Sequence, residues 1–339
     1  MFFQKKIAFF EVEEWEKEYI RKNLKGFSIQ FFDGPLSDKN ISKVKNSECL
    51  GIFIYSKITK EILDKLPKLK IIATLSTGFD HIDLDECARR NIIVCNVPFY
   101  GENTVAEHTF ALILALSRKI FQSIKRTKGG NFSYDGLRGF DLKGKTIGLI
   151  GTGHISAHVA RIAYGFEMKI LGYDMNQDPE LVKNYGLKYV DMNTLLKGSD
   201  IVSLHLPLND KTRYTISKKN ITLMKPTALL INTARGGLIE TDALAKALQN
   251  KRIGGAGLDV LEEESIIKEE RQLLSEQFTP TYNMQTLLEN HILMQLDNVI
   301  ITPHNAFNSE EALLRIIDTS LENIRNFSKR MPQNVVTKR

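Results

Sequence analysis

The amino-acid sequence predicts an α/β fold with two doubly wound parallel-sheet domains. Over residues 1–100, five short apolar runs alternate with helical or polar segments, which is the pattern of a parallel sheet covered by helices. A second series of apolar runs begins at Thr146–Ile150 and continues to residue 302. The chain has 339 residues, which is long enough for two domains that each have a core of their own.

The first series of expected strands lies before residue 100. Its members are Lys6–Phe10, Ser28–Phe32, Leu50–Tyr55, Lys70–Leu75 and Ile92–Val97, and helical segments such as Glu13–Leu24 and Lys60–Leu66 separate them. The turn Ser76–Asp80 directly follows the fourth run. Gly78 in this turn leaves backbone N–H groups open at the carboxyl end of a strand, where ligands bind to parallel sheets.

A break at Gly101 separates this series from a long helix. Thr104–Glu107 has the pattern of a capping box that opens the helix, whose apolar face includes Phe110 and Leu114. The stretch Lys125–Gly139 is basic and contains glycine, and it ends just before Phe140. Two interpretations of it stay open, a surface loop before the next strand and an arm that contacts another subunit. Its aromatic residues, with the neighbouring Phe140, are Phe132, Tyr134 and Phe140.

The most informative stretch joins a strand to a helix through a glycine turn. Thr146–Ile150 is a buried-strand run, the Gly151–Gly153 turn follows, and apolar residues then recur at helical spacing. Free N–H groups and the positive helix end make such a turn a site for the diphosphate of a dinucleotide. Asp174 ends the next run, Lys169–Tyr173, about where a ribose-binding acid belongs. Ser156 replaces the third glycine, so we expect the helix to lie slightly farther from the sheet.

The rest of the chain completes two domains. Four further runs, added to the two around the glycine turn, make six strands; they are Asp200–Leu206, Ala228–Asn232, Gly254–Leu258 and Asn298–Thr302. The segment Leu261–Leu296 is long, polar and partly helical, and its function does not follow from its pattern. The amphipathic stretch Glu310–Phe327 should pack back on the first domain. We therefore expect one domain of residues 1–101 plus 305–339 and another of residues 102–304.

Composition excludes several classes of protein. A hydrophobic content of 42% and a charged content of 25% are typical of soluble proteins, and no apolar run has membrane-spanning length or follows a signal-peptide pattern. Cys49, Cys87 and Cys95 lack metal-ligand spacing, so we expect no metal and buried free thiols in a reducing cytoplasm. The net charge of +6 is scattered among acids, which indicates no nucleic-acid partner and suits a small anionic substrate.

Three chemically active residues follow successive strands of the second series. They are Arg235, Glu264 and His304, and the carboxyl ends of parallel strands share one edge, which also holds the glycine turn. Reduction of a 2-keto acid needs a hydride, a proton for the alkoxide and a clamp for the carboxylate. Histidine can act as the acid and base, a nearby carboxylate favours the imidazolium, and arginine orients a carboxylate. The set predicts this chemistry.

Eight motifs in this order resemble the D-isomer-specific 2-hydroxyacid dehydrogenase family, and within it the D-lactate dehydrogenase branch. They cover nearly the whole chain: TGFDHIDL (77–84), NVPFYGENTVAEH (96–108), GTGHI (151–155), ILGYD (170–174), SLHLPL (203–208), NTARGGLIETDAL (232–244), GLDVLEEE (257–264) and ITPHNAF (301–307). The resemblance implies a flavodoxin-like substrate domain, a Rossmann domain that binds NAD, and a cytoplasmic homodimer. It also implies a small 2-keto or 2-hydroxy acid as the substrate.

The resemblance assigns roles to individual residues. Arg235 binds the substrate, His304 is the acid/base and Glu264 is the partner of that histidine. The positions implied to contact the substrate are Thr77 and Gly78 through backbone N–H groups, and Tyr55, Tyr100 and Phe307 as an aromatic wall. The positions implied to contact NAD are Thr104, Gly151, Gly153, His154, Ile155, Asp174, His205, Leu206, Pro207, Thr212, Thr233, Ala234 and Asp259, with Asp259 near the carboxamide.

Some features depart from the family pattern or leave alternatives. Ser265 stands where many relatives have proline, and the run Glu262–Glu264 makes the choice of acid depend on register, with the spacing from Asp259 favouring Glu264. An enzyme for a phosphorylated (phosphoglycerate-type) or bulkier 2-hydroxy acid is one alternative. A non-catalytic NAD(H)-sensing protein of the same fold is another. The aromatic residues and the absence of an extra cation favour pyruvate-sized or apolar keto acids.

Overall fold

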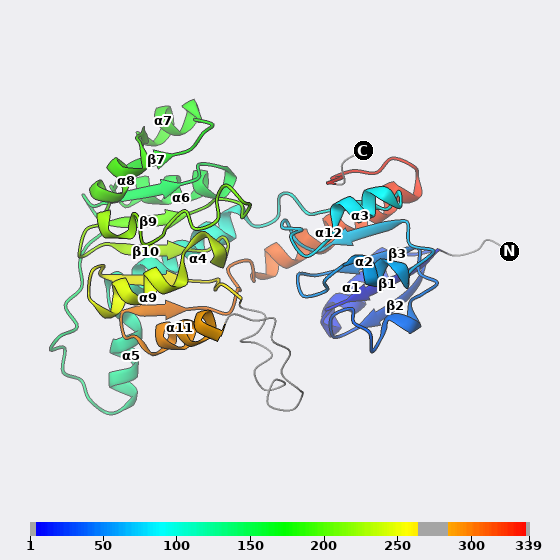
Figure 1. Cartoon of the computed structure of the whole chain (residues 1–339), viewed down its shortest axis with the longest axis horizontal. Coiled ribbons are helices and arrows are strands. Elements are labelled where there is room, and N and C mark those ends of the chain that lie inside the picture. Colours follow the sequence, from blue (N-terminus) through cyan, green and yellow to red (C-terminus); the bar gives the residue numbers. More distant parts are fainter. Residues whose placement is uncertain (1–4, 264–283, 337–339) are drawn as a thin grey trace. The chain divides into compact units, whose positions relative to one another are not determined.

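The computed structural model describes residues 5–263 and 284–336, which divide into two units (Figure 1). One unit consists of Met1–Tyr100 with Ser309–Arg339, and the other of Gly101–Asn308. The boundaries expected from the sequence lay at residues 101/102 and 304/305. In the structure the chain returns to the first unit at residue 309, directly before the last helix. Each unit contains its own parallel sheet.

The first unit is built on a five-stranded sheet in the order β2-β1-β3-β4-β5, and every neighbouring pair is parallel. This is the flavodoxin-like order that the sequence predicted. Apolar side chains on both faces of the central strands are buried, because helices cover both faces. The strands are β1 (Lys6–Phe10), β2 (Ser28–Phe32), β3 (Cys49–Ile52), β4 (Ile71–Thr74) and β5 (Ile93–Cys95).

Helices of the first unit come from both ends of the chain. The helical elements are α1 (Glu14–Asn23), η1 (Ile41–Lys43), α2 (Lys60–Asp64), α3 (Leu84–Arg89) and α12 (Glu310–Ser328). Ser309 caps α12 by accepting a hydrogen bond from the Ala312 N–H at 3.3 Å. The side-chain amide of Asn323 in α12 donates to the Asn96 carbonyl at 2.9 Å. The prediction that this amphipathic stretch packs on the first domain is confirmed.

The second unit contains a seven-stranded parallel sheet in the order β12-β11-β10-β9-β6-β7-β8. This is the Rossmann order with one strand added at an edge. The strands are β6 (Thr146–Ile150), β7 (Lys169–Tyr173), β8 (Lys188–Tyr189), β9 (Ile201–Leu204), β10 (Leu229–Asn232), β11 (Gly255–Leu258) and β12 (Val299–Ile301). The expected number of six strands was wrong. The missed strand, β8, has two residues, too few to form an apolar run.

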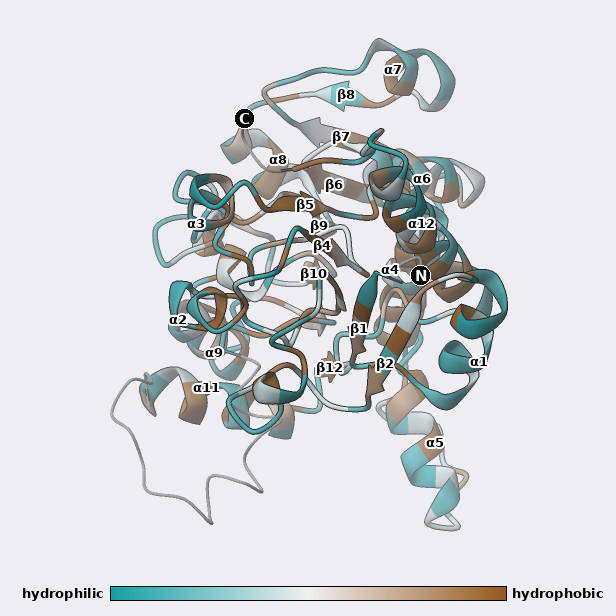
Figure 2. Ribbon diagram, turned by 90° about the vertical axis from the view of Figure 1, so that its right-hand side faces the viewer, coloured by the Kyte–Doolittle hydropathy of each residue, from teal (hydrophilic) through white to brown (hydrophobic). Residues whose placement is uncertain are grey.

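Helices pack on the second sheet, and in Figure 2 hydrophilic residues predominate in α7 and in the edge strand β8. The helical elements are α4 (Glu102–Ser117), α5 (Ile120–Lys128), α6 (His154–Gly165), α7 (Pro179–Tyr185), α8 (Met192–Gly198), η2 (Ile221–Leu223), η3 (Gly236–Leu238), α9 (Thr241–Gln249) and α11 (Met284–Gln295). The segment predicted to be partly helical thus contains α11, and residues 264–283 lie outside the described residues.

The start of α4 corrects one prediction. Gly101 is the N-cap, so the helix begins at Glu102 and Thr104 lies buried in its first turn. The capping box predicted at Thr104–Glu107 is therefore wrong. An acid at the first helical position interacts favourably with the positive end of the helix dipole, which makes a start three residues earlier favourable.

Ser156, which replaces the third glycine of the turn motif, is fully buried in α6. Its hydroxyl oxygen has no hydrogen-bond partner among the described residues. A serine Cβ at this position is thus accommodated in the packed interior. The expected outward displacement of α6 stays a prediction.

The basic stretch Lys125–Gly139 begins as helix and continues as an irregular segment. Helix α5 extends to Lys128, so the loop starts later than the sequence suggested. The side chains of Phe132 and Tyr134 are 82% and 84% exposed. Phe140 instead packs against the core of the second unit. The irregular part of the stretch is therefore shorter than predicted, and both interpretations, surface loop and contact arm, stay open.

The three cysteines are buried free thiols, as predicted. Burial raises the pKa of all three thiols, to about 12 for Cys87 and Cys95. Among the described residues, no helix has both the length and the apolar character that crossing a membrane requires. The same residues contain no group of three or more histidine, cysteine, aspartate or glutamate side chains that could hold a metal ion.

Candidate active site

The turn between β6 and α6 has its shape because of two glycines. Gly151 has φ +89°, and a Cβ there would lie 2.7 Å from the His205 carbonyl oxygen. Gly153 is the N-cap of α6, and a Cβ added to it would meet no atom within 4 Å. A side chain at the N-cap would therefore extend into unoccupied space, and no side chain caps this 12-residue helix. This arrangement fits the diphosphate of a dinucleotide.

Asp174, directly after β7, is held against this turn. Its Oδ2 accepts a hydrogen bond from the Thr152 N–H at 2.6 Å, and its Oδ1 accepts one from the Asn176 N–H at 2.8 Å. The carboxylate is half-buried. It lies where a ribose hydroxyl could donate to it, and residues 175–177 contain no lysine or arginine that would bind a 2′-phosphate.

The segment after β9 contributes a neutral histidine. The His205 Nε2 lies 2.9 Å from the Ser203 hydroxyl, and desolvation lowers the pKa of His205 from 6.5 to about 4. The imidazole is therefore uncharged at neutral pH. Thr212 closes the following loop by donating to the Pro207 carbonyl at 2.6 Å. This loop, which includes Leu206, is shaped by its own hydrogen bonds beside the glycine turn.

Asn232, at the end of β10, shapes the turn that contains Arg235. Its side-chain amide donates to the Arg235 carbonyl at 2.9 Å and accepts from the Ala234 N–H at 3.0 Å. The hydroxyl of Thr233 lies 3.0 Å from that of Thr109 on α4. A Cβ at the next residue, Gly236, would overlap the Leu261 backbone. The absence of a side chain there lets the arginine turn lie directly against the start of the acidic run.

The acidic run contains one carboxylate whose role is structural. Glu262 Oε1 accepts from Arg213 Nη2 at 2.9 Å and from the Tyr214 hydroxyl at 2.7 Å. Its Oε2 accepts from the Thr241 hydroxyl at 2.9 Å. Both oxygens of Glu262 are thus bound by neighbours in its own unit. Glu264, the acid that the sequence favoured, lies outside the described residues.

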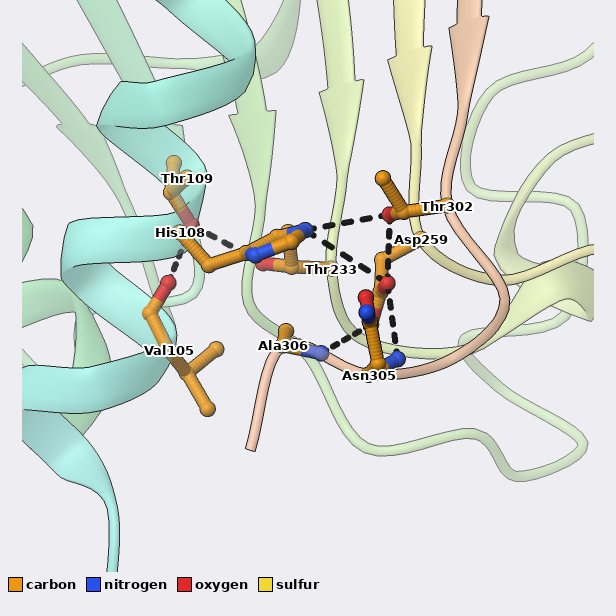
Figure 3. A network of polar contacts seen from close by, with 8 residues as sticks. All are labelled: Val105, His108, Thr109, Thr233, Asp259, Thr302, Asn305 and Ala306. Carbon is orange, nitrogen blue, oxygen red and sulfur yellow. Dashed lines mark hydrogen bonds and ion pairs between the residues drawn. The ribbon is translucent and has the colours of Figure 1, made fainter. Parts of the chain in front are cut away.

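Asp259, at the end of β11, organises the turn of residues 302–306 (Figure 3). Its buried carboxylate accepts from the Thr302 hydroxyl at 2.5 Å, from the Asn305 N–H at 3.0 Å and from the Ala306 N–H at 2.9 Å. The His304 N–H donates to the Asp259 carbonyl at 2.9 Å, and His304 has φ +54°. This left-handed conformation is unfavourable for a histidine, so the hydrogen bonds of Asp259 are what hold it.

Sequence reasoning missed one member of this network, His108 on α4. Its Nε2 lies 3.0 Å from the Thr302 hydroxyl and 3.5 Å from Asp259 Oδ1 (Figure 3). The available signal was its position on the same helix face as the buried residues Val105 and Leu112. A half-buried polar residue on an otherwise apolar face needs a partner, and the partner here lies 194 residues later.

The first unit holds four of the predicted substrate residues near the carboxyl edge of its sheet. The Thr77 hydroxyl donates to the Val97 carbonyl at 2.6 Å, and the Ser76 hydroxyl donates to the Gly78 carbonyl at 2.6 Å. Tyr55 follows β3, and the Tyr100 carbonyl accepts from Arg315 Nε at 2.5 Å. Phe307 belongs to the second unit.

The predicted cofactor residues are concentrated at one edge of the second sheet. The glycine turn, Asp174, His205 and the Thr233–Ala234 turn all follow carboxyl ends of β6, β7, β9 and β10. His154 and Ile155 form the first turn of α6, and His154 Nδ1 lies 3.7 Å from Glu102 Oε1. The resemblance implied only that Asp259 contacts NAD. In the structure its carboxylate also accepts hydrogen bonds from the 302–306 turn.

Comparisons with known proteins agree with this geometry. A family model described as D-isomer specific 2-hydroxyacid dehydrogenase, NAD binding domain, matches residues 110–306. A glyoxylate reductase of Thermococcus litoralis is 38% identical, with 93% of this chain and 92% of that protein covered. A D-lactate dehydrogenase of Escherichia coli is 34% identical, with 96% and 97% covered. The crystal structure of an Aquifex aeolicus D-lactate dehydrogenase complexed with NAD and lactic acid has a TM-score of 0.89 and 36% identity, and covers 98% and 99%.

Proposed function

The chain belongs to the D-isomer-specific 2-hydroxyacid dehydrogenase family and is an NAD-dependent dehydrogenase, and on this premise we propose that it interconverts a small 2-keto acid and its D-2-hydroxy acid. The observation that carries the proposal is the turn in which Asp259 holds His304 at the edge of the sheet that also presents Arg235 and the glycine turn. We propose that the second unit binds NAD and that the first unit binds the substrate.

The residues of the second unit would hold the cofactor. Gly151 and Gly153 leave room for the diphosphate beside the start of α6, and Asp174 accepts hydrogen bonds at the place expected for a ribose. Bound NADH supplies the hydride that reduces C2 of the keto acid. We propose a preference for NAD over NADP, since Asp174 would repel a 2′-phosphate. Equal catalytic efficiency with NADPH would contradict this preference.

The reaction also needs a proton and a clamp, and three side chains are proposed to supply them. His304 donates its proton to the forming alkoxide oxygen and takes it back in the reverse direction. Arg235 binds the carboxylate through its planar guanidinium. Glu264 is proposed to stabilise the imidazolium of His304, because the spacing from Asp259 favours it. Another acid of the run, Glu262, already accepts hydrogen bonds at both oxygens, from Arg213, Tyr214 and Thr241.

A pair of conservative substitutions tests the choice of acid. Glu264→Gln removes the charge and keeps an oxygen, so keto-acid reduction should decline at a lower pH than in the parent. Glu262→Gln is the control and should leave the pH profile of the rate unchanged, although it lowers stability. If only Glu262→Gln shifts the pH profile, Glu264 is the wrong acid and Glu262 is the partner of His304. If neither variant shifts it, the histidine–carboxylate pair is wrong.

The substrate is proposed to be small or apolar, with pyruvate as the leading candidate. The resemblance implies that Tyr55, Tyr100 and Phe307 contact the substrate, and aromatic rings favour an apolar side chain over a phosphate. The Escherichia coli and Aquifex aeolicus relatives are D-lactate dehydrogenases. Glyoxylate is the second candidate, which the similarity to the Thermococcus litoralis glyoxylate reductase favours.

One experiment tests the function, namely NADH oxidation against glyoxylate, pyruvate, phenylpyruvate and phosphohydroxypyruvate. We expect turnover with pyruvate or glyoxylate, and the product should be the D isomer by chiral chromatography. Efficient use of phosphohydroxypyruvate with rejection of pyruvate would overturn the substrate assignment. Binding of NADH without turnover of any keto acid would favour the NAD(H)-sensing alternative.

We also propose a homodimer and a cytoplasmic location. The apolar side chains Ile120, Phe121 and Ile124 of α5 are 45%, 57% and 48% exposed, and Phe132 and Tyr134 lie nearby in sequence with still larger exposure. Such a concentration of exposed apolar area is typical of a subunit contact. A monomeric mass by light scattering at micromolar concentration would contradict the dimer. The free thiols of the three cysteines support a reducing compartment.

A further inference from the structure

A carboxylate in the first unit joins two loops that the sequence leaves far apart. Glu11 directly follows β1, and its Oε1 accepts from the Tyr55 N–H at 2.9 Å. Its Oε2 accepts from the Phe53 N–H at 3.1 Å and from the Ser56 hydroxyl. One side chain thus receives hydrogen bonds from three residues of the loop that follows β3.

The network continues to a third loop. The Ser56 hydroxyl, which donates to Glu11, also accepts from the Leu36 N–H at 2.9 Å, and Ser56 is completely buried. Leu36 belongs to the segment that follows β2. The loops after β2, β1 and β3, which are neighbours in the sheet, are therefore linked through the Glu11 carboxylate and one hydroxyl.

The location of Glu11 is the topological switch point of this sheet. The connection after β1 leads to β2 on one side of the sheet, and the connection after the neighbouring strand β3 leads to β4 on the other side, so the two run in opposite directions. In open parallel sheets, ligands bind in the crevice outside the carboxyl ends of the strands at such a point. Tyr55 stands on the bound loop with its side chain 39% exposed and its ring edge-on to that of Phe53, with 6.0 Å between centroids.

The backbone of Glu11 indicates that this carboxylate is held in place for its contacts. Glu11 has φ +60°, a left-handed conformation that L residues with a side chain adopt rarely, and such conformations persist where the surroundings determine them. Desolvation raises the pKa of Glu11, while the hydrogen bonds from Ser56 and from the backbone of the loop oppose this shift. A glycine would fit the turn without strain, and only an acid supplies the two acceptor oxygens.

We propose that Glu11 is a positioning residue that fixes the 53–56 loop and thereby sets which keto-acid side chain the enzyme accepts. The proposal rests on the proposed function, because it takes Tyr55 as part of the substrate wall. A pocket distinguishes substrates that differ by one methylene by only about 10- to 200-fold, so a small displacement of one aromatic wall changes their ranking. Release of the loop should favour bulkier keto acids.

The test uses two variants of the full chain and one control. Glu11→Gln replaces one acceptor oxygen with an N–H donor that faces the loop amides, and Ser56→Ala removes one donor to Glu11. Glu14→Gln is the control, since the Glu14 side chain is 74% exposed and forms an ion pair with Lys17. We measure kcat/KM for pyruvate and phenylpyruvate, NADH affinity by fluorescence, and hydrogen exchange at the amides of Phe53 and Tyr55.

We expect faster amide exchange in the 53–56 loop and a ratio of phenylpyruvate to pyruvate kcat/KM that rises roughly tenfold in Glu11→Gln. Ser56→Ala should change the exchange rate and the kcat/KM ratio in the same direction but to a smaller extent. If Glu11→Gln does not fold, the result for Ser56→Ala tests the proposal. NADH affinity and the control should not change. Unchanged exchange in a folded variant overturns the proposed link between the loops. Faster exchange with an unchanged ratio, or an equal loss for both substrates, overturns the specificity role.

The proposed function fails separately. If the parent protein turns over none of glyoxylate, pyruvate and phenylpyruvate with NADH, that function is wrong and the specificity role fails with it. The exchange rates still decide whether Glu11 holds the loop, because they do not depend on turnover.

Discussion

The carboxyl edges of the two sheets are built by different means. In the seven-stranded sheet, the β6–α6 turn is made by the backbone, since Gly151 adopts φ +89° and Gly153 leaves open space at the helix start. In the five-stranded sheet, side chains hold the loops. The carboxylate of Glu11 binds the loop after β3, and the side-chain amide of Asn96 donates to the Thr77 carbonyl at 2.8 Å.

On the proposed assignment, the difference lets one chain combine a fixed cofactor site with an adjustable substrate site. The glycine turn would bind the constant diphosphate of a dinucleotide mainly through the backbone, with the Asp174 carboxylate bound to the Thr152 N–H of that turn. A loop held by side chains changes its shape when one residue changes, so specificity can alter while the sheet stays intact. Changes at the carboxyl edge of the seven-stranded sheet should therefore affect all substrates alike. Changes at the carboxyl edge of the five-stranded sheet should affect them unequally.

The largest expected effect concerns the 302–306 turn. At this turn a side chain, that of Asp259, holds the edge of the seven-stranded sheet. His304→Ala should lower kcat by roughly 10²–10⁴-fold, the usual contribution of a positioned acid/base group. The loss should be the same for every keto acid, and NADH affinity measured by fluorescence should not change. His291→Ala on α11 serves as the control. A loss confined to one keto acid would contradict the comparison.

The next effect tests the backbone site with two glycines. Gly151→Ala forces an alanine to φ +89° with its Cβ 2.7 Å from the His205 carbonyl oxygen, so both the melting temperature and NADH affinity should fall. Gly153→Ala places a methyl group in open space, so NADH affinity should fall by about tenfold or more at an unchanged melting temperature.

Calorimetry and fluorescence titration separate the two results. If Gly153→Ala binds NADH as the parent does, the diphosphate does not lie at the start of α6.

A smaller effect is expected at the edge held by side chains. The Thr74 hydroxyl lies 2.7 Å from the Ser76 hydroxyl and 3.3 Å from His81 Nε2, so it supports the loop that presents Thr77. Thr74→Val should raise KM for keto acids by about 2- to 10-fold, the equivalent of one net hydrogen bond, with little change in kcat or NADH affinity. Thr319→Val on α12 is the control, and a fall in NADH affinity would contradict this prediction.

The smallest effect depends on pH and belongs to the second unit. The pKa of His205 is lowered from 6.5 to about 4, so between these values the unfolded chain binds more protons than the folded one. Stability should therefore fall as the pH falls from 6.5 towards 4. His205→Gln should weaken this dependence in melting curves recorded without cofactor. An unchanged slope would show that the imidazole is not desolvated.

The sequence predicted the sheets well because their signals are local. β1, β2, β6 and β7 have the predicted bounds, and the run of β1, for example, lies between the charged residues Lys5 and Glu11. The two-residue strand β8 and the start of α4 were missed. A two-residue strand leaves no periodicity, and a helix N-terminus can be moved by one turn when a glycine and an acid precede the expected cap.

The sequence by itself determined the family, the fold class and the glycine turn, because each depends on motifs whose residues lie close together in the chain. Only the tertiary structure decided which groups Glu11, Glu262 and His108 contact. The Phe53 amide that Glu11 binds is 42 residues away, and the Thr302 hydroxyl that His108 contacts is 194 residues away. A hydrogen bond depends on distance and direction in space, and no pattern along the chain specifies those before the sheets have formed.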